Sequence, residues 1–214
     1  ETLALARHAH EVQAHHIVIA PPPGHYSPSE LVGYVRCVHD AVPLPLVLVQ
    51  TSSRGFDIDV LRELISGKTI ISAAKIGASQ GDLGQLFAKF GNRITITDPL
   101  EANWLSNITE FGMGLLYADP EPYLYQVPGY RPIESYHRAA VAGDISAART
   151  GSDELRDLRD IYDRWIMQPL LSGVAPIGAL KAWCEFLGMD VGPPRQPLRP
   201  LEADERGTLY RQLA

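Results

Sequence analysis

The fold is decided by residues 46–75, LVLVQTSSRGFDIDVLRELISGKTIISAAK, which contain the pattern of one βαβ unit. The apolar run 46–49 predicts a buried strand, and residues 51–55 predict a loop. Residues 57–65 have their apolar side chains at helical spacing, and 69–74 predict the next strand. Strands that are apolar throughout and joined by a helix are typical of a parallel sheet covered on both faces. The stretch therefore predicts an α/β fold.

The same alternation continues on both sides of that unit. Further strands are predicted at residues 17–20, 94–97 and 114–117, and further helices at 2–12, 29–41 with Ser29 as N-cap, 82–90 and 101–111. After residue 136 the strands stop, and helical patterns follow at 136–142, 146–167, 179–187 and 201–213. The spacing fits a barrel and an open doubly wound sheet equally well.

Composition excludes several classes of function. The chain has 214 residues and a formal net charge of -6, without a basic run that a phosphate backbone would contact, so no nucleic acid partner is expected. No apolar stretch approaches the roughly 20 residues that cross a bilayer, and the first residues form no signal-peptide core. We therefore expect a cytoplasmic protein with no membrane partner. Cys37 and Cys184 are expected to be small core residues rather than a disulfide.

Several short motifs, taken in order and spacing, resemble the dihydrodipicolinate synthase and N-acetylneuraminate lyase family over essentially the whole chain. The motifs are ETLALA (1–6), Pro21-Pro22, AVPLP (41–45), Ser53-Arg54, Lys75, GMG (112–114) and the tail LGMDVGPPRQPLRPL (187–201). The resemblance implies a (β/α)8 TIM barrel with strands 4 to 8 in this chain and a C-terminal helical extension. The expected division is 1–130 for the barrel part, and 131–214 for the last barrel helix and the extension. Truncation, processing or a partner chain is the expected reason for the missing first three units.

Lys75 is the candidate reactive amine. It ends the run 70–74, whose small residues leave room beside it, at the strand end where barrels place catalysis. A lysine buried in such a place gives up its proton more easily, because burying the charged form is costly, and can then attack a carbonyl. The alternative is an ordinary solvated lysine at a strand end, which the pattern alone favours and the resemblance disfavours.

The resemblance also assigns substrate contacts. It implies that Arg54 holds a substrate carboxylate, with Ser53 and Leu116 beside the substrate. The family's proton-relay tyrosine falls on Val49, which cannot move a proton. Tyr26 and Tyr117 are the candidates to replace it, and a packing or rim tyrosine is the alternative for each.

Weaker patterns suggest other ligands. Gly77, Gly81 and Gly84 could cradle a phosphate at a helix N-terminus, but no Lys-Ser/Thr follows, and an insertion in the loop explains them as well. The histidines at 8, 10, 15 and 16 diverge on a helix or alternate on a strand, so no metal site is expected.

These features together predict a lyase. It would condense, cleave or dehydrate a 2-oxo acid, pyruvate-like at one end, through a Schiff base on Lys75, without a cofactor. The expected assembly, by resemblance, is a homodimer or homotetramer. The alternative is a catalytically silent relative that acts as a binding or regulatory subunit, and the valine at position 49 motivates it.

Overall fold

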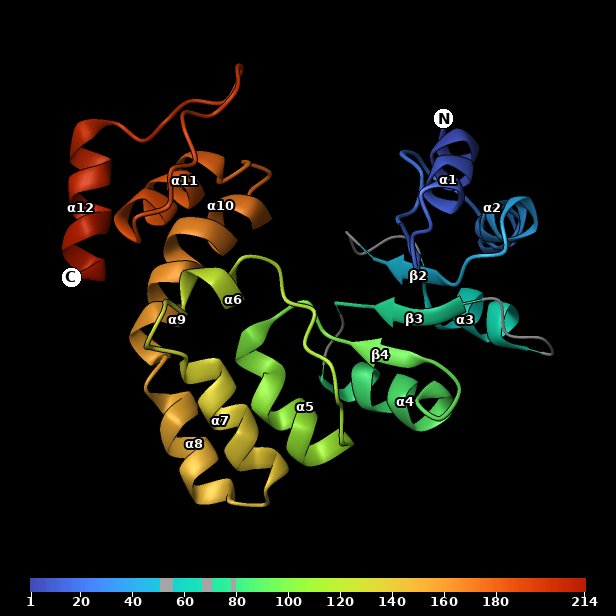
Figure 1. Ribbon diagram of the computed structural model, residues 1–214, viewed down its shortest axis with the longest axis horizontal. Helices are drawn as coiled ribbons and strands as arrows, with labels where there is room; N and C mark the ends of the chain where they lie inside the picture. Colours follow the sequence, from blue (N-terminus) through green and yellow to red (C-terminus); the bar gives the residue numbers. More distant parts are fainter. Residues whose placement is uncertain (51–55, 67–70, 78–79) are drawn as a thin grey trace. The chain divides into compact units, whose positions relative to one another are not determined.

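The chain divides into two compact units, Glu1–Asp119 and Pro120–Ala214. The computed structural model describes residues 1–50, 56–66, 71–77 and 80–214. Figure 1 shows its elements in sequence colours. The predicted division at residue 130 separates a barrel part from an extension, and it stays a prediction.

The first unit is built on a parallel sheet. Its strands are β1 (Ile17–Ile19), β2 (Leu46–Val49), β3 (Ile71–Lys75) and β4 (Thr95–Thr97), hydrogen-bonded in that order. All three neighbouring pairs are parallel, and the arrows of β2, β3 and β4 point the same way in Figure 1. The α/β prediction is confirmed, and the predicted strand at 46–49 matches β2 residue for residue.

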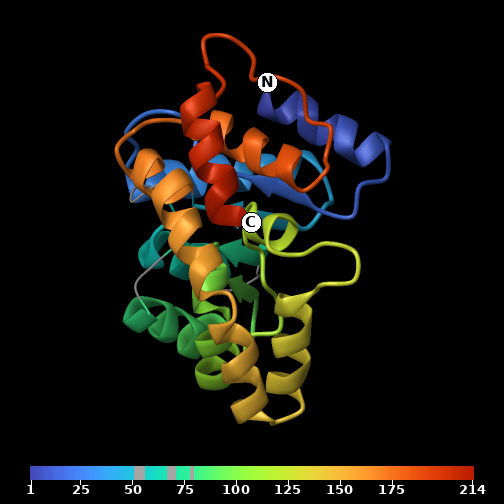
Figure 2. The same ribbon diagram turned by 90° about the vertical axis from the view of Figure 1, so that its left-hand side faces the viewer.

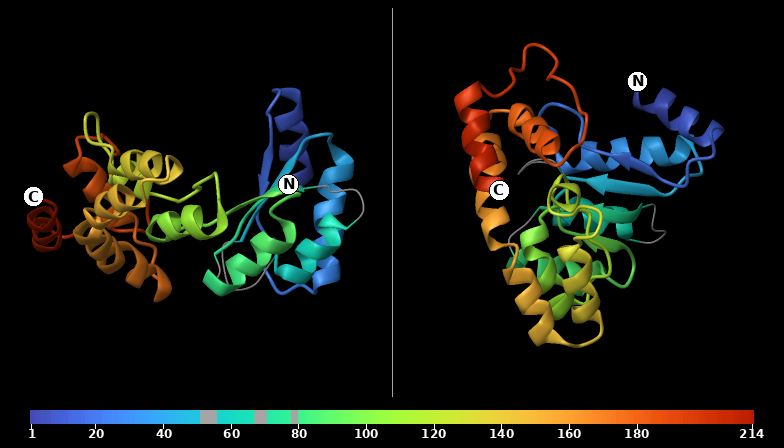
Figure 3. Two further views of the ribbon diagram at one scale, coloured as in Figure 1. Left: turned by 90° about the horizontal axis from the view of Figure 1, so that it is seen from below. Right: turned by 60° about the vertical axis from the view of Figure 1, so that its left-hand side comes forward.

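Helices follow the strands in chain order. They are α1 (Thr2–Glu11), α2 (Pro28–Ala41), α3 (Ile58–Ile65), α4 (Gln80–Phe90), the 3-10 turn η1 (Glu101–Asn103) and α5 (Trp104–Phe111). Figure 3 shows α1 to α4, from blue to green, succeeding one another along the sheet. Leu46 and Leu48 of β2 are fully buried, as are Leu61 of α3 and Leu83 of α4. Burial of these side chains is the main favourable term that holds helices on a sheet.

The start of α2 differs from the prediction. The N-cap is Ser27, whose side chain accepts from the backbone N–H of Glu30, while the Glu30 carboxylate accepts from the backbone N–H of Ser27. Pro28 occupies the first helical turn, where its missing N–H costs nothing, so the cap lies just before it. The prediction of Ser29 as cap was wrong. Hydrogen bonds from the Ser27 backbone and hydroxyl hold the pKa of Glu30 below its usual value.

The predicted strand at 114–117 is not formed. Helix α5 ends at Gly112, which has a φ of 66° in the left-handed region that glycine adopts without strain. The chain then runs beside β4, but it is held there by a side chain instead of a backbone ladder. Thr97 Oγ1 donates to the Leu115 carbonyl oxygen at 2.8 Å and accepts from the Tyr117 N–H at 3.0 Å.

In its described residues the second unit is helical, as predicted. Its helices are α6 (Glu121–Leu124), α7 (Pro132–Val141), α8 (Ile145–Asp153), α9 (Arg156–Tyr162), the π-helical turn η2 (Asp163–Met167), α10 (Gln168–Leu171), α11 (Ile177–Phe186) and α12 (Ala203–Leu213). The single helix predicted for 146–167 is thus three segments. Figure 2 shows α7 beside α8 and α12 beside α11. Tyr136, Leu155, Trp183 and Leu209 form the buried centre of this unit.

The two cysteines differ in environment. Cys184 is buried, and burial raises the pKa of its thiol. Cys37 is exposed, so its prediction as a core residue was wrong. It lies on α2, next to the buried stripe that contains Val35 and Val38. Among the described residues, no helix is long and apolar enough to cross a membrane.

Candidate functional site

Three side chains lie level at the carboxyl ends of neighbouring strands. Val49 of β2 pairs in register with Lys75 of β3, and Lys75 pairs with Thr97 of β4. Backbone bonds continue past the strand ends, because Gln50 N–H donates to the Lys75 carbonyl and Ile76 N–H donates to the Thr97 carbonyl, both at 3.0 Å. Side chains paired in register point to the same face of a sheet. The lysine is therefore held between a valine and a threonine on a fixed backbone.

The Lys75 ammonium is buried and has two partners. The residue is 4% exposed. Its Nζ donates to Asp119 Oδ1 at 2.5 Å and lies 4.5 Å from the centre of the Tyr117 ring. A buried ammonium requires such partners, since an isolated charge away from water is very unfavourable. The aromatic face adds an attraction of about 0.5–2 kcal/mol.

The ion pair is asymmetric. The Lys75 side chain is 5% exposed, whereas the Asp119 side chain is 70% exposed. The amine is thus screened from water on the protein side and reaches solvent through the carboxylate. A small molecule that approaches from solvent meets Asp119 and Lys75 together.

Thr97 fixes the segment that carries both partners of the lysine. The residue is 1% exposed, and its hydroxyl bonds Leu115 and Tyr117 of the segment that follows α5. Tyr117 and, two residues later, Asp119 are thereby placed over the end of β3. The missing fifth strand is replaced at this point by one threonine.

Of the predicted catalytic residues, the structure brings Lys75 and Tyr117 together. Tyr26 is exposed, and its hydroxyl donates to the Pro23 carbonyl at 3.0 Å. Leu116 is half-buried in the segment beside β4. The predicted carboxylate-binding pair, Ser53 and Arg54, lies outside the described residues.

Sequence reasoning missed Asp119. The signal was present, because Asp119 follows the predicted strand at 114–117, and residues after neighbouring parallel strands meet at one edge of the sheet.

A second acidic residue near the site has a structural role. Asp98 is 2% exposed and follows Thr97 at the end of β4. Its carboxylate accepts from the Leu100 N–H at 2.8 Å and from the side-chain amides of Asn103 at 2.9 Å and Asn107 at 3.3 Å. With three donors Asp98 anchors the turn into α5, so we assign it no chemical role.

The glycines after β3 are packing glycines where the structure describes their surroundings. A Cβ on Gly84 would lie 2.9 Å from the Phe111 ring, and one on Gly77 would lie 3.3 Å from Pro99 Cγ. A close contact between α4 and α5 accounts for Gly84, and a close contact between the segments after β3 and β4 accounts for Gly77, without a phosphate in either case. The described part of the chain also contains no group of three His, Cys, Asp or Glu side chains placed to hold a metal ion.

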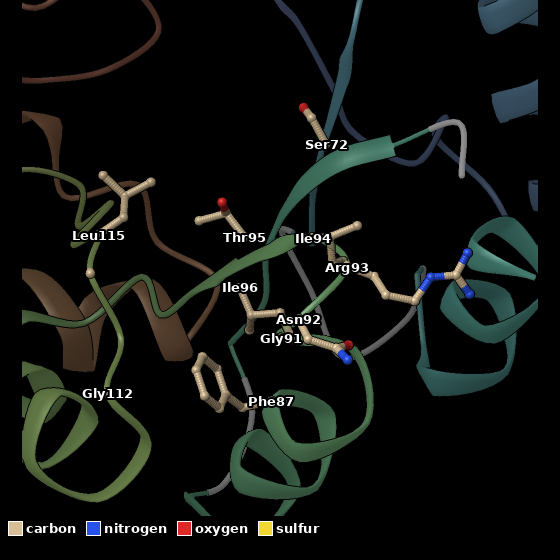
Figure 4. A pocket seen from close by; sticks show the side chains of 11 residues that line it. Ser72, Phe87, Gly91, Asn92, Arg93, Ile94, Thr95, Ile96, Gly112 and Leu115 are labelled. Carbon is tan, nitrogen blue, oxygen red and sulfur yellow. The ribbon is translucent and has the colours of Figure 1, made fainter. Parts of the chain in front are cut away.

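A hollow of the first unit lies at the opposite ends of the strands. It has a volume of about 600 Å³ and is lined by Ser72, Thr95, Leu115, Phe87 and the residues around Arg93. Figure 4 shows Ser72 and Thr95 at the start of their strands, with Phe87 of α4 below them. Lys75, Tyr117 and Asp119 do not line it. Barrel enzymes place their chemistry at the carboxyl ends of the strands, so this hollow is not the candidate site.

The arrangement of parallel strands with intervening helices is that of a (β/α)8 barrel, and Lys75 lies at the carboxyl end of one of these strands. More particularly, solved structures of two kinds share this fold. Dihydrodipicolinate synthase from Aquifex aeolicus has a TM-score of 0.78 at 21% identity, over 99% of this chain and 69% of that one. A variant of Sulfolobus solfataricus 2-keto-3-deoxygluconate aldolase has a TM-score of 0.79 at 16% identity, over 99% and 68%.

A third structure agrees with these two. KD(P)GA from T. tenax has a TM-score of 0.77 at 19% identity and covers 99% of this chain and 70% of its own. No protein-family model and no curated protein matches the sequence. The predicted barrel fold is thus confirmed through structure, and at these identities the likeness shows the fold alone.

Proposed function

We propose that this chain is a lyase that forms a Schiff base between Lys75 and the carbonyl of a 2-oxo acid. The observation that carries the proposal is the burial of one lysine at the carboxyl end of a central parallel strand, with its amine directed at the exposed Asp119. Catalysis at this edge of the strands is the rule for the barrel fold. Solved structures with the fold include aldolases named for 2-keto acid substrates, one of them in complex with D-KDPG.

The proposed chemistry uses the iminium as an electron sink. Once the lysine nitrogen is bonded to C2 of the substrate, its positive charge stabilises the carbanion that forms when a bond at C3 breaks or a proton leaves. A pyruvate-like carboxylate next to C2 would be held by Arg54 and Ser53, with Leu116 along the substrate. Tyr117 and Tyr26 are proposed to transfer or orient protons. The resulting enzyme would need no cofactor, and we propose that it works in the cytoplasm as a homodimer or homotetramer.

Trapping tests the proposal directly. The protein is incubated with pyruvate and borohydride, digested and mapped by mass spectrometry, with 2-oxobutyrate as a second substrate and acetate as a blank. We expect a reduced adduct on Lys75 and none on Lys181, whose amine donates to the carbonyls of Val191 and Gly192. Absence of a Lys75 adduct, under conditions that label a known aldolase of this fold, would refute the proposal.

A silent binding subunit is the second candidate. Val49, which lies in register beside Lys75, favours it because a valine carries no proton. A silent protein would raise its melting temperature when a 2-oxo acid is added and yet give no reducible adduct. Thermal shift and trapping on the same sample therefore separate the two functions.

A further inference from the structure

The side chain best placed to move protons at Lys75 was not among the expected relay residues. We propose that Asp119 is the catalytic acid and base of imine formation, which takes protons from the Lys75 nitrogen and passes them to the departing carbonyl oxygen. This inference rests on the proposed Schiff-base function and adds a residue to it. It follows from the direct contact of Asp119 Oδ1 with Lys75 Nζ at 2.5 Å.

The other side chains around the amine are poorly suited to this task. Val49 has no polar atom. The Thr97 hydroxyl already donates to Leu115 and accepts from Tyr117. Tyr117 presents its ring face to Nζ at 4.5 Å. Among these described neighbours, Asp119 offers the lysine a proton acceptor.

The exposure of Asp119 suits a group that serves both amine and substrate. Its side chain is 70% exposed, so the carboxylate contacts the buried nitrogen on one side and faces solvent on the other. A substrate carbonyl that lies close enough to Nζ to be attacked would therefore also lie within reach of the Asp119 carboxylate. Proton transfer needs hydrogen-bond distance between the groups, which the Lys75 contact already provides.

The proposed step is balanced in atoms and charge. The ammonium gives one proton to Asp119, and the neutral amine attacks C2, so that an N–C bond forms and the carbonyl π pair moves to oxygen. Asp119 protonates that oxygen, accepts a second proton from nitrogen, and delivers it as the C–O bond breaks. The nitrogen lone pair forms the iminium, water leaves, and Asp119 ends as the carboxylate it was at the start. One ammonium and one carbonyl thus yield one iminium and one water.

The two possible roles of Asp119, proton acceptor and mere counter-ion, predict opposite effects of its removal on the rate of imine formation. A carboxylate beside an ammonium stabilises the charged form, which cannot attack a carbonyl. Removing a mere counter-ion would therefore speed imine formation near neutral pH. Removing a proton acceptor would slow it, by roughly 10²-fold for general acid–base catalysis.

The test measures the rate of borohydride-trapped adduct on Lys75 with pyruvate, from pH 6 to 9, in the full chain and four variants. Asp119→Asn keeps the shape of the side chain and loses proton uptake, and Asp119→Glu restores a carboxylate. Asp119→Ala makes room for added formate as an external base. Asp59→Asn is the matched control, because Asp59 is an exposed aspartate paired with an arginine, Arg62 on α3. Circular dichroism checks that each variant is folded.

We expect slow adduct formation in Asp119→Asn with a changed pH profile, recovery in Asp119→Glu, rescue of Asp119→Ala by formate, and an unchanged rate in Asp59→Asn. Adduct formation in Asp119→Asn at the wild-type rate or faster would overturn the role of Asp119 while leaving the Schiff base intact. A wild-type chain without any adduct would instead refute the proposed function, so the two failures are distinct.

Discussion

The two ends of the parallel sheet differ in what they bury. At the carboxyl end, a charged amine is buried beside an aromatic face and an exposed carboxylate. At the amino end, a hollow of about 600 Å³ is lined by neutral side chains of β3 and β4 and by the turn around Arg93.

Of the two ends, the one that buries an ammonium tells more about function, because that arrangement is energetically unfavourable without partners. Hollows between elements arise wherever packing is incomplete, and the bare edge of a sheet produces them readily. Burial of an ammonium is unfavourable unless partners are supplied, so it persists only where the surrounding structure holds it. The carboxyl end contains such a buried ammonium, and variants of the residues around it can separate their contribution to chemistry from their contribution to stability.

The largest expected effect is that of Lys75→Met on trapping. The variant should give no adduct with pyruvate and borohydride at any position, because the proposed nucleophile is gone. Its free energy of unfolding in urea should stay the same or rise by about 1 kcal/mol, since an apolar side chain of similar length avoids the cost of burying the charge. Asp119 remains hydrated and so leaves no buried charge behind.

Lys181→Met is the matched control for that variant. Lys181 holds the carbonyls of Val191 and Gly192 at 2.5 and 3.1 Å in the helical unit. Its loss should lower the unfolding free energy by about 1–2 kcal/mol because backbone acceptors lose their donor, and it should leave trapping intact. An adduct in Lys75→Met, or its absence in Lys181→Met, would contradict the contrast between the two lysines.

The second effect concerns the threonine that replaces the missing strand. Thr97→Val keeps the shape of the side chain but removes one donor to Leu115 and one acceptor for Tyr117. We expect a loss of about 2 kcal/mol in urea unfolding, since two backbone groups near a buried site lose their partner. Thr97→Ser keeps the hydroxyl and should lose less. Equal stability of Thr97→Val and the wild type would show that the segment 115–119 is held by other contacts.

Most of the fold could be predicted from the sequence. Strands β1 and β2 are apolar throughout and the helices of the first unit have an apolar face, so these elements are specified locally, and the order of β and α then fixes a parallel sheet. The last predicted strand is an exception. Residues 114–117 have the composition of a strand, but a ladder depends on a partner backbone, and here Thr97 supplies the bonds through its side chain.

The candidate site could be predicted only in part. Lys75 was identifiable because the end of a strand and the motifs around it point to the same position. For Asp119 the sequence offered only its place after the predicted strand at 114–117, because its contact with Lys75 spans 44 residues of sequence and depends on how the chain turns after Gly112. Tyr26 was favoured by resemblance, and its hydroxyl in fact closes a local turn onto Pro23. Long-range contacts of exposed polar residues leave no periodic trace in a sequence.

A smaller effect separates the packing and phosphate interpretations of the glycines beyond β3. Gly84→Ala places a methyl group 2.9 Å from the Phe111 ring, so overpacking should outweigh the gain in helix propensity and destabilise by about 1 kcal/mol. Gly33→Ala is the control on α2, where a Cβ meets nothing within 4 Å. That variant should be stabilised by about 0.5–1 kcal/mol. Stabilisation of both variants in urea unfolding would reject packing as the reason for Gly84.

The smallest effect comes from an exposed ion pair, the counterpart of the buried one. Glu205 lies in the first turn of α12, where Arg199 and the Glu202 N–H, both just before the helix, donate to its carboxylate and lower its pKa to about 2. Because the folded pKa lies below the ordinary value of 4.5, the contribution to stability is present above that value and disappears as the pH falls toward 2. The melting temperatures of the wild type and Glu205→Gln should therefore differ slightly at pH 6 and converge near pH 2, and added salt should reduce the difference at pH 6. If the difference in melting temperature grew on acidification, the pair of Arg199 and Glu205 would not stabilise the helix. The stability contributed by the pair at Lys75 could then not be compared with that of an exposed ion pair.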